Sequence, residues 1–362
     1  MKPAAQLNEF GQSAWLDLIG RKLIESGELE RMVAEDGVRG VTANPAIFQK
    51  AIAESTEYAS ALGKLAGKSP LLSYEALAVA DVRDACDVLR PLYDQTRGGD
   101  GFCSLEVSPA IARDTAATVT EAKRFWGDVD RPNVLIKIPA NAEGLDAIRQ
   151  ATAAGISVNI TLIFSTKVYG QVIEAYLKGL EERVARGEPV SHIHSVASFF
   201  VSRVDTAVDK ELEALGTPEA KTLLGTIANA NAKEAYQLFL YTVGTPRWKA
   251  LEAKGATRQR PLWASTGTKN KAYSDVLYVE PLIGRDTVNT LPLATLQAFN
   301  DHGKVKETIT QGVDVARAQL KKLGELGVDL EKICTQLTED GLELFSKALI
   351  GLLKTIEAQA KP

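Results

Sequence analysis

Short apolar runs alternate with longer amphipathic stretches along most of this 362-residue chain, and no other feature constrains the fold as much. Such alternation is typical of repeated strand and helix units wound around a parallel sheet. Eight runs have the length and composition of strands: residues 13–19, 38–42, 102–107, 133–138, 157–164, 195–200, 260–265 and 286–291. Eight is the strand number of a closed (β/α)8 barrel, so the sequence predicts an α/β fold of the TIM-barrel type.

Amphipathic segments between these runs have the apolar spacing of helices that cross over the outside of a barrel. The clearest predicted helices cover residues 109–126, 143–154, 166–186 and 218–240. Because such a barrel needs only about 250 residues, we expect a helical insertion at about 51–93 and C-terminal helices at about 301–362. No linker or internal repeat interrupts the sequence, so we expect one domain over residues 1–362.

Polar side chains occur near the ends of seven of the eight predicted strands, although buried parallel strands are otherwise almost wholly apolar. In barrels of this kind the chemistry takes place at the carboxyl ends of the strands. For Asn44, Thr161 or Ser198 taken singly, a helix cap or an internal hydrogen bond remains an equal alternative. Together the side chains predict a polar pocket formed by Asp17, Asn44, Glu106, Lys137, Asn159, Thr161, Ser198 and Ser265.

Lys137 is a single cation within the apolar run 133–139 (NVLIKIP). Burying an ammonium group is costly, and a lysine in a dry pocket avoids that cost by losing its proton. The neutral amine is then a nucleophile that attacks carbonyl carbons. The alternative is that Lys137 lies at a strand end and extends its amine to solvent past Pro139.

Composition excludes several other classes of function. The formal net charge of −4 argues against nucleic acid or an anionic membrane as a partner. No run approaches the roughly 20 apolar residues of a membrane span, and residues 1–10 do not resemble a targeting segment. We therefore expect a cytoplasmic protein.

The cysteines and histidines do not form a recognisable metal motif. Cys86, Cys103 and Cys334 are widely spaced, and the pair His192 and His194 lacks a third ligand, so we expect reduced thiols and no metal. The glycine-rich segment 98–101 lacks both the GxGxxG spacing and a directly following helix. It is therefore predicted to be a turn and not a nucleotide-binding loop.

Two motifs resemble those of transaldolases. Residues 40–48 (GVTANPAIF) resemble the motif on the second strand of that family, and residues 134–139 (VLIKIP) resemble its Schiff-base lysine segment. The resemblance extends from the first strand to the seventh, through Asp17 and residues 105–107 (LEV), 159–164 (NITLIF) and 198–203 (SFFVSR).

This resemblance implies roles for individual residues. Lys137 would form the Schiff base, Glu106 with Thr161 would handle an ordered water, and Asp17 would move the proton of the substrate hydroxyl. A helix cap remains the alternative for Asp17, and a structural ion pair with Lys137 remains the alternative for Glu106. The residues implied to bind the dihydroxyacetone part of the substrate are Thr42, Asn44, Asn159 and Ser198.

The sugar phosphate would be held by Arg203, Ser265 and a second cation, and here the sequence departs from the best-known branch of the family. Residues 265–269 (STGTK) replace a shorter segment that ends in arginine. Lys269 is the first candidate for the second cation and Lys271 the second. The segment also resembles a phosphate nest, with a polar surface loop as the alternative. Further departures, which together resemble a longer-chain bacterial branch of these class I Schiff-base enzymes, are Ala43, Phe199 and Ser202.

The implied activity is that of a transaldolase of the pentose phosphate pathway that works without a cofactor. It would move a dihydroxyacetone unit from sedoheptulose 7-phosphate or fructose 6-phosphate to glyceraldehyde 3-phosphate or erythrose 4-phosphate. The expected partners are these sugar phosphates, and the chain could be a monomer or a homodimer. The alternatives are a fructose 6-phosphate aldolase-like lyase that releases dihydroxyacetone, and a non-catalytic sugar-phosphate-binding barrel.

Overall fold

Eight parallel strands form a closed barrel in the computed structural model, which describes residues 1–359. Each strand pairs with its neighbours in sequence, and β1 pairs with β8 to close the barrel. All eight predicted strands are confirmed, with ends that differ by at most three residues. The strands are β1 Gln12–Leu16, β2 Val38–Val41, β3 Phe102–Glu106, β4 Val134–Pro139, β5 Val158–Ile163, β6 Ser195–Phe200, β7 Gln259–Ala264 and β8 Thr287–Leu291.

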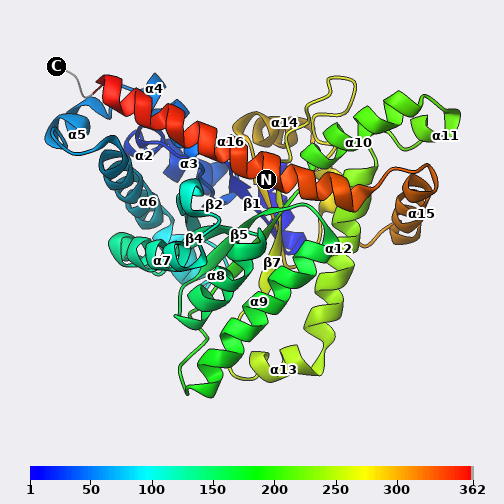
Figure 1. The fold of residues 1–362 in the computed structure, drawn as a ribbon, viewed down its shortest axis with the longest axis horizontal. Helices are drawn as coiled ribbons and strands as arrows, with labels where there is room; N and C mark the ends of the chain where they lie inside the picture. The colour runs from blue at the N-terminus through cyan, green and yellow to red at the C-terminus, as the bar shows by residue number, and fades with distance from the viewer. Residues whose placement is uncertain (360–362) are drawn as a thin grey trace.

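Helices surround the barrel (Figure 1). Those before β3 are α1 Pro3–Gln6, α2 Arg21–Glu25, α3 Glu28–Glu35, α4 Pro45–Glu54, α5 Ala59–Lys64 and α6 Pro70–Gln95, with the 3-10 turn η1 Leu7–Phe10. Those between β3 and β7 are η2 Pro109–Ile111, α7 Thr115–Val129, α8 Ala142–Ala153, α9 Thr166–Ala185, α10 Ser202–Leu215, α11 Pro218–Lys221, α12 Ile227–Gly244 and α13 Pro246–Glu252. The remainder are η3 Glu280–Leu282, α14 Leu293–His302, α15 Val313–Glu325 and α16 Leu330–Gln359. The last three residues of the predicted C-terminal helices, 360–362, lie outside the described residues.

Two predicted helices differ from the observed ones. Residues 109–111 form the separate turn η2, and α7 begins only at Thr115, because the side chain of Asp114 accepts a hydrogen bond from the Ala117 amide and caps the helix there. The predicted helix 218–240 is broken into α11 and α12. The break contains Gly225, whose positive φ of 68° is incompatible with a continuous helix.

The register of the strands places polar residues at one level of the barrel. Glu106 on β3 lies beside Lys137 on β4, which in turn lies beside Asn159 on β5. All six residues of β4 and all six of β5 are buried, as expected for parallel strands covered on both faces. The polar side chains of Glu106, Lys137 and Asn159 are therefore surrounded by buried apolar residues.

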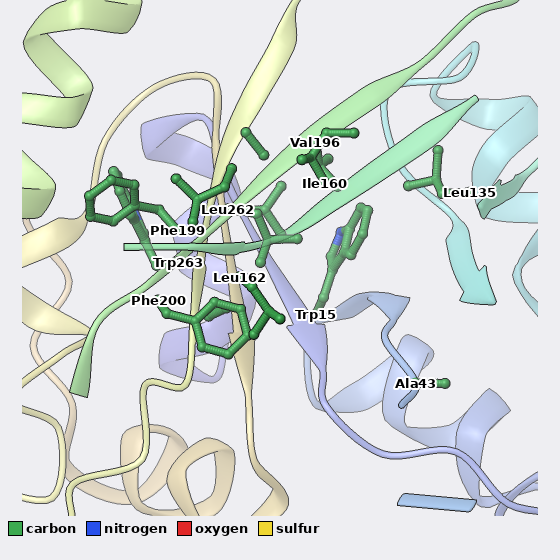
Figure 2. Packing of buried hydrophobic residues seen from close by; sticks show 14 of the residues in the cluster. Trp15, Ala43, Leu135, Ile160, Leu162, Val196, Phe199, Phe200, Leu262 and Trp263 are labelled. Atoms are coloured by element: carbon green, nitrogen blue, oxygen red, sulfur yellow. The ribbon is translucent and has the colours of Figure 1, made fainter. Parts of the chain in front are cut away.

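Large apolar side chains fill the space around β5, β6 and β7 (Figure 2). Phe199 packs edge-on against Trp263, with ring centroids 6.2 Å apart, and against Tyr169 of α9 at the same separation. The adjacent Phe200 lies near Leu162 in Figure 2 and contacts the ring of Phe164. Consecutive residues of β6 therefore point to opposite sides of the strand.

An ion-pair cluster closes the amino-terminal end of the barrel. Asp100, in the predicted turn 98–101, accepts hydrogen bonds from Ser13, Trp15 and Arg39 at 2.8, 3.2 and 2.7 Å. Arg260 of β7 lies 3.4 Å from the same carboxylate. The turn thus anchors the end of the barrel opposite to the polar strand ends.

The long C-terminal helix α16 lies across the barrel in Figure 1 and packs against α4, α6 and α10. Gly341 of this helix faces the side chain of Leu162, and an added Cβ would approach that side chain to 2.7 Å. Leu162 has a positive φ of 61°, which is strained for a branched residue. No helix within residues 1–359 is both long and apolar enough to cross a membrane.

Candidate active site

A cavity of about 160 Å³ opens at the carboxyl ends of the strands, where the sequence predicts the polar pocket. It brings together nine predicted site residues: Asp17, Thr42, Asn44, Lys137, Thr161, Ser198, Arg203, Ser265 and Lys269. Glu106 and Asn159 lie behind this lining, in contact with residues that form it. Lys271, the second candidate for the phosphate cation, does not line the cavity.

Lys137 is buried, with only 5% of its surface exposed. Its amine Nζ lies 3.2 Å from Oε2 of Glu106 and donates a hydrogen bond of 3.1 Å to the carbonyl of Ala43. The ring centroid of Phe345, on α16, is 5.6 Å from Nζ. The alternative in which Lys137 extends to solvent is therefore wrong, because the amine is held inside the cavity.

Glu106 is buried in an ion pair with Lys137, and Thr161 also carries a buried side-chain oxygen. Burial raises the pKa of Glu106, while the neighbouring Lys137 lowers it. Oε2 of Glu106 faces the Lys137 amine but accepts no well-aligned hydrogen bond, and Oγ1 of Thr161 is buried without a hydrogen-bond partner among residues 1–359. Two such oxygens next to a cavity are suited to bind a water or a substrate hydroxyl.

Asp17 follows β1 and is oriented by two threonines. Burial raises the pKa of Asp17, whereas Lys137 and a hydrogen bond from Thr42 lower it. The Thr42 hydroxyl donates to Oδ1 of Asp17 at 2.8 Å and lies 2.6 Å from the hydroxyl of Thr290. Because a hydroxyl has one hydrogen, Thr290 must donate to Thr42 when Thr42 donates to Asp17.

Asp17 does not cap a helix. The next helix, α2, has Gly20 at its N-cap and no side-chain cap. The helix-cap alternative for Asp17 is therefore wrong. Its carboxylate is instead held at the cavity by Thr42.

Asn44 caps α4 and also lines the cavity. Its Oδ1 accepts a hydrogen bond of 3.0 Å from the amide of Ile47, so the N-cap alternative is confirmed for this residue. The cap uses only the side-chain oxygen. The amide nitrogen Nδ2, which can only donate, is then the group that can serve a ligand.

Two buried side-chain hydrogen bonds in series orient Ser198. The Ser198 hydroxyl donates to Oδ1 of Asn159 at 2.7 Å, and Nδ2 of Asn159 donates to Oγ of Ser104 at 3.0 Å. Asn159 has no exposed surface. It therefore fixes the orientation of the Ser198 hydroxyl, whose lone pairs can accept a hydrogen bond from a ligand.

Two cations lie at the side of the cavity formed by β6 and β7. The guanidinium of Arg203 lies over the Phe200 ring, 5.3 Å from its centroid, and burial lowers the pKa of Arg203. Lys269 is exposed in the loop after β7. Neither side chain forms an ion pair with another described residue, so both positive charges are available to an anion.

The backbone bends sharply at Ser265, where β7 ends and the loop toward Lys269 begins. Its φ of 55° lies in the left-handed region, which is unfavourable for serine. The side-chain hydroxyl lies 3.0 Å from that of Ser202. After this bend, Gly267 and Lys269 of the loop line the cavity together with Arg203.

Sequence patterns did not identify Phe345 and Thr290, which line the cavity, or Ser104, which lies behind it in contact with Asn159. Phe345 comes from a helix more than 200 residues after Lys137, and no spacing rule connects the two. Thr290 belongs to the eighth predicted strand, the one to which we assigned no polar site residue. Its position near the end of that strand, just before Leu291 and Pro292, was the signal that could have identified it. Ser104 lies two residues before Glu106, and strand alternation could have placed both on the same face.

The histidines predicted not to bind metal lie at the other end of the barrel. The ring of His194 packs on Phe102 with centroids 5.0 Å apart, and burial lowers the pKa of His194 to about 4. It therefore packs as a neutral aromatic ring. Within residues 1–359, no group of three or more His, Cys, Asp or Glu side chains could hold a metal ion. Cys86, Cys103 and Cys334 are free and buried.

The sequence is similar to those of known transaldolases over nearly its whole length. The family model described as transaldolase/fructose-6-phosphate aldolase matches residues 14–356. The transaldolase of Thiobacillus denitrificans is 49% identical over 358 residues, which cover 98% of this chain and 100% of that protein. Transaldolase 2 of Streptomyces coelicolor is 49% identical over 98% of this chain and 96% of its own length. The transaldolase of Trichodesmium erythraeum is 43% identical over 98% of this chain and 97% of its own length.

Proposed function

The chain belongs to the transaldolase/fructose-6-phosphate aldolase family, and from that premise we propose how its cavity performs a transaldolase reaction. The enzyme transfers a dihydroxyacetone unit between sugar phosphates. The observation that carries the assignment of residues is the buried amine of Lys137, 3.2 Å from Glu106 and facing the cavity. An amine in this position can form an imine with the donor ketone.

Imine formation joins Nζ of Lys137 to C2 of the donor and expels the C2 oxygen as water. The leaving oxygen needs a proton, and the water that later hydrolyses the imine needs a base. We assign both tasks to Glu106, acting through a water that Thr161 also binds. Support comes from the unpartnered hydroxyl of Thr161, from the contact of Glu106 with Lys137 and from the raised pKa of Glu106, which lets a carboxyl group carry a proton nearer neutral pH.

Cleavage of the C3–C4 bond needs a base at the C4 hydroxyl. Asp17 accepts that proton, the bond electrons move into the protonated imine, and an aldose phosphate leaves as the aldehyde. The enamine left on Lys137 attacks the acceptor aldehyde, and Asp17 returns the proton to the new hydroxyl. Burial raises the pKa of Asp17, and the charge of Lys137 and the hydrogen bond from Thr42 oppose this effect by favouring the ionised form that this step requires.

Binding of the three-carbon unit falls to the polar groups around Lys137. Nδ2 of Asn44 takes no part in the helix cap and donates to a substrate oxygen. Ser198 binds a substrate hydroxyl directly, and Asn159 positions Ser198. Thr42 is likewise assigned to the orientation of Asp17, a change from the direct substrate contact implied by family resemblance.

Arg203 and Lys269 are assigned to the terminal phosphate of the substrate. We expect Arg203→Ala to weaken kcat/KM for phosphorylated donors by about 1.5 to 3 kcal/mol, the scale of a charge-assisted hydrogen bond. Unphosphorylated fructose should be little affected. Lys269→Ala should act in the same direction but more weakly, because an ammonium on an exposed stem is more easily replaced by water. Steady-state kinetics with both donors measures the effect, and equal losses for both would contradict phosphate binding.

Transfer and release are the two outcomes open to the enamine on Lys137, and an acceptor assay separates them. We expect fructose 6-phosphate with erythrose 4-phosphate to yield sedoheptulose 7-phosphate, with little free dihydroxyacetone formed when the acceptor is left out. Rapid release of dihydroxyacetone without acceptor would identify the aldolase-like lyase instead. No turnover with any donor would indicate the non-catalytic barrel.

The cytoplasmic location, the single domain over residues 1–362 and the monomeric or homodimeric state stay predictions of the sequence. A sedimentation measurement gives the oligomeric state directly.

A further inference from the structure

The loop between β7 and η3 carries Lys269 and is tied to helix α10 at three points. The same helix carries Arg203 in its first turn. The first tie joins Ser202 to Ser265, where the Ser202 amide donates to the Ser265 carbonyl at 3.0 Å and the two hydroxyls lie 3.0 Å apart. The start of the loop is thereby fixed to the start of α10.

The second tie is the carboxylate of Asp209, two turns further along α10. Tyr273 donates its hydroxyl to Oδ2 of Asp209 at 2.7 Å, and the amide of Gly225 donates to Oδ1 at 2.9 Å. The Tyr273 ring lies against Gly225, where an added Cβ would come within 2.8 Å of the ring. The break between α11 and α12 therefore forms a seat for this tyrosine.

The third tie is made by the buried carboxylate of Asp205. Tyr278 donates its hydroxyl to Oδ2 of Asp205 at 3.0 Å, and the amide of Ala228 donates to Oδ1 at 2.7 Å. Residues 265–278 are thus held at the start, near the middle and at the end by one helix.

Lys269 lies in a compact part of this loop that includes Tyr273. The hydroxyl of Thr268 donates to the carbonyl of Ser274 at 2.8 Å and closes the segment. Within it, the amide of Tyr273 donates to the carbonyl of Asn270 at 3.1 Å. The bond between Thr268 and Ser274 encloses Lys269 and Tyr273 in one closed segment, so the attachment of Tyr273 also restrains the backbone of Lys269.

We propose that the hydrogen bond between Tyr273 and Asp209 is a latch that positions Lys269 opposite Arg203 and so sets the preference for phosphorylated substrates. This inference rests on the phosphate role proposed for Lys269. Lys269 is exposed, so the conformation of its loop decides where its amine lies. A loop that is already ordered loses less conformational entropy when a ligand binds. One rigid helix then holds both cations, Arg203 directly and Lys269 through the latch.

The test is Tyr273→Phe, which removes one hydroxyl and keeps the ring that packs on Gly225. We expect KM for fructose 6-phosphate to rise about 2- to 10-fold, the scale of one ordinary hydrogen bond, with kcat nearly unchanged. KM for unphosphorylated fructose should not change. Tyr241→Phe, at a tyrosine that is 72% exposed, is the matched control and should leave both donors unaffected.

A double variant shows whether the latch acts through Lys269. In a Lys269→Ala background, Tyr273→Phe should add no further increase in KM, because the positioned charge is already gone. An equal increase in both backgrounds would overturn the latch, as would an unchanged KM in Tyr273→Phe beside a raised KM in Lys269→Ala. An unchanged KM in Lys269→Ala itself would remove the phosphate role of Lys269 and the latch together.

Discussion

Replacing Lys137 with methionine is expected to lower turnover by more than about 10⁴-fold, the scale at which loss of a covalent nucleophile is felt. Methionine is apolar and similar in length, so the packing against Phe345 is kept while the amine is lost. Borohydride reduction in the presence of fructose 6-phosphate should add one dihydroxyacetone-derived mass to the wild-type protein and none to Lys137→Met. Peptide mass spectrometry should place that mass on Lys137.

Lys233 of α12 provides the matched control. Burial lowers the pKa of Lys233, which makes its amine the competing candidate for the label. Its amine donates to the carbonyls of Thr308 and Gln311 at 2.7 and 2.6 Å and does not line the cavity. We expect Lys233→Met to keep the label and most of the activity. A label that persists in Lys137→Met and disappears in Lys233→Met would overturn the assignment of the nucleophile.

The barrel was predictable because its strands are short, apolar and separated by helices of adequate length. These are local properties, and the closed order of β1 to β8 follows from the handedness and adjacency of strand–helix–strand units. The errors in the helices arose where single residues override periodicity. Asp114 starts α7 late by capping it, and Gly225 lies between α11 and α12 with a positive φ that a continuous helix cannot adopt.

The site residues on the barrel strands were predictable from the sequence, and those contributed by distant segments were not. Lys137, Glu106 and Asn159 share one level because neighbouring strands are in register, a consequence of the barrel alone. Phe345 reaches the cavity from α16, and the position of Lys269 depends on ties from its loop to α10. Both are tertiary contacts between segments far apart in sequence, for which hydrophobic spacing gives no signal.

Substituting Asp17 by asparagine should lower turnover by about 10²-fold or more, the usual effect of removing a positioned general base. The variant keeps an oxygen that can accept the hydrogen bond from Thr42, so the geometry around the cavity is preserved. The asparagine amide cannot take the C4 proton, and the C3–C4 bond therefore stays intact. We expect borohydride to trap the intact donor sugar on Lys137 at nearly the wild-type rate.

Glu106→Gln is the contrasting variant, because it removes the group assigned to the water of imine formation and leaves Asp17 in place. Glutamine is similar in size to Glu106 and can still contact Lys137, but it carries no proton between the amine and the leaving oxygen. We expect the label on Lys137 to accumulate slowly, and the adduct that does form to carry the three-carbon unit, since cleavage by Asp17 is retained. Mass spectrometry distinguishes the two adducts directly: a whole sugar phosphate in Asp17→Asn and dihydroxyacetone alone in Glu106→Gln. The same adduct at the same rate in both variants would show that the two carboxylates do not have separate tasks, and the division of acid–base work between the first and third strands would have to be abandoned.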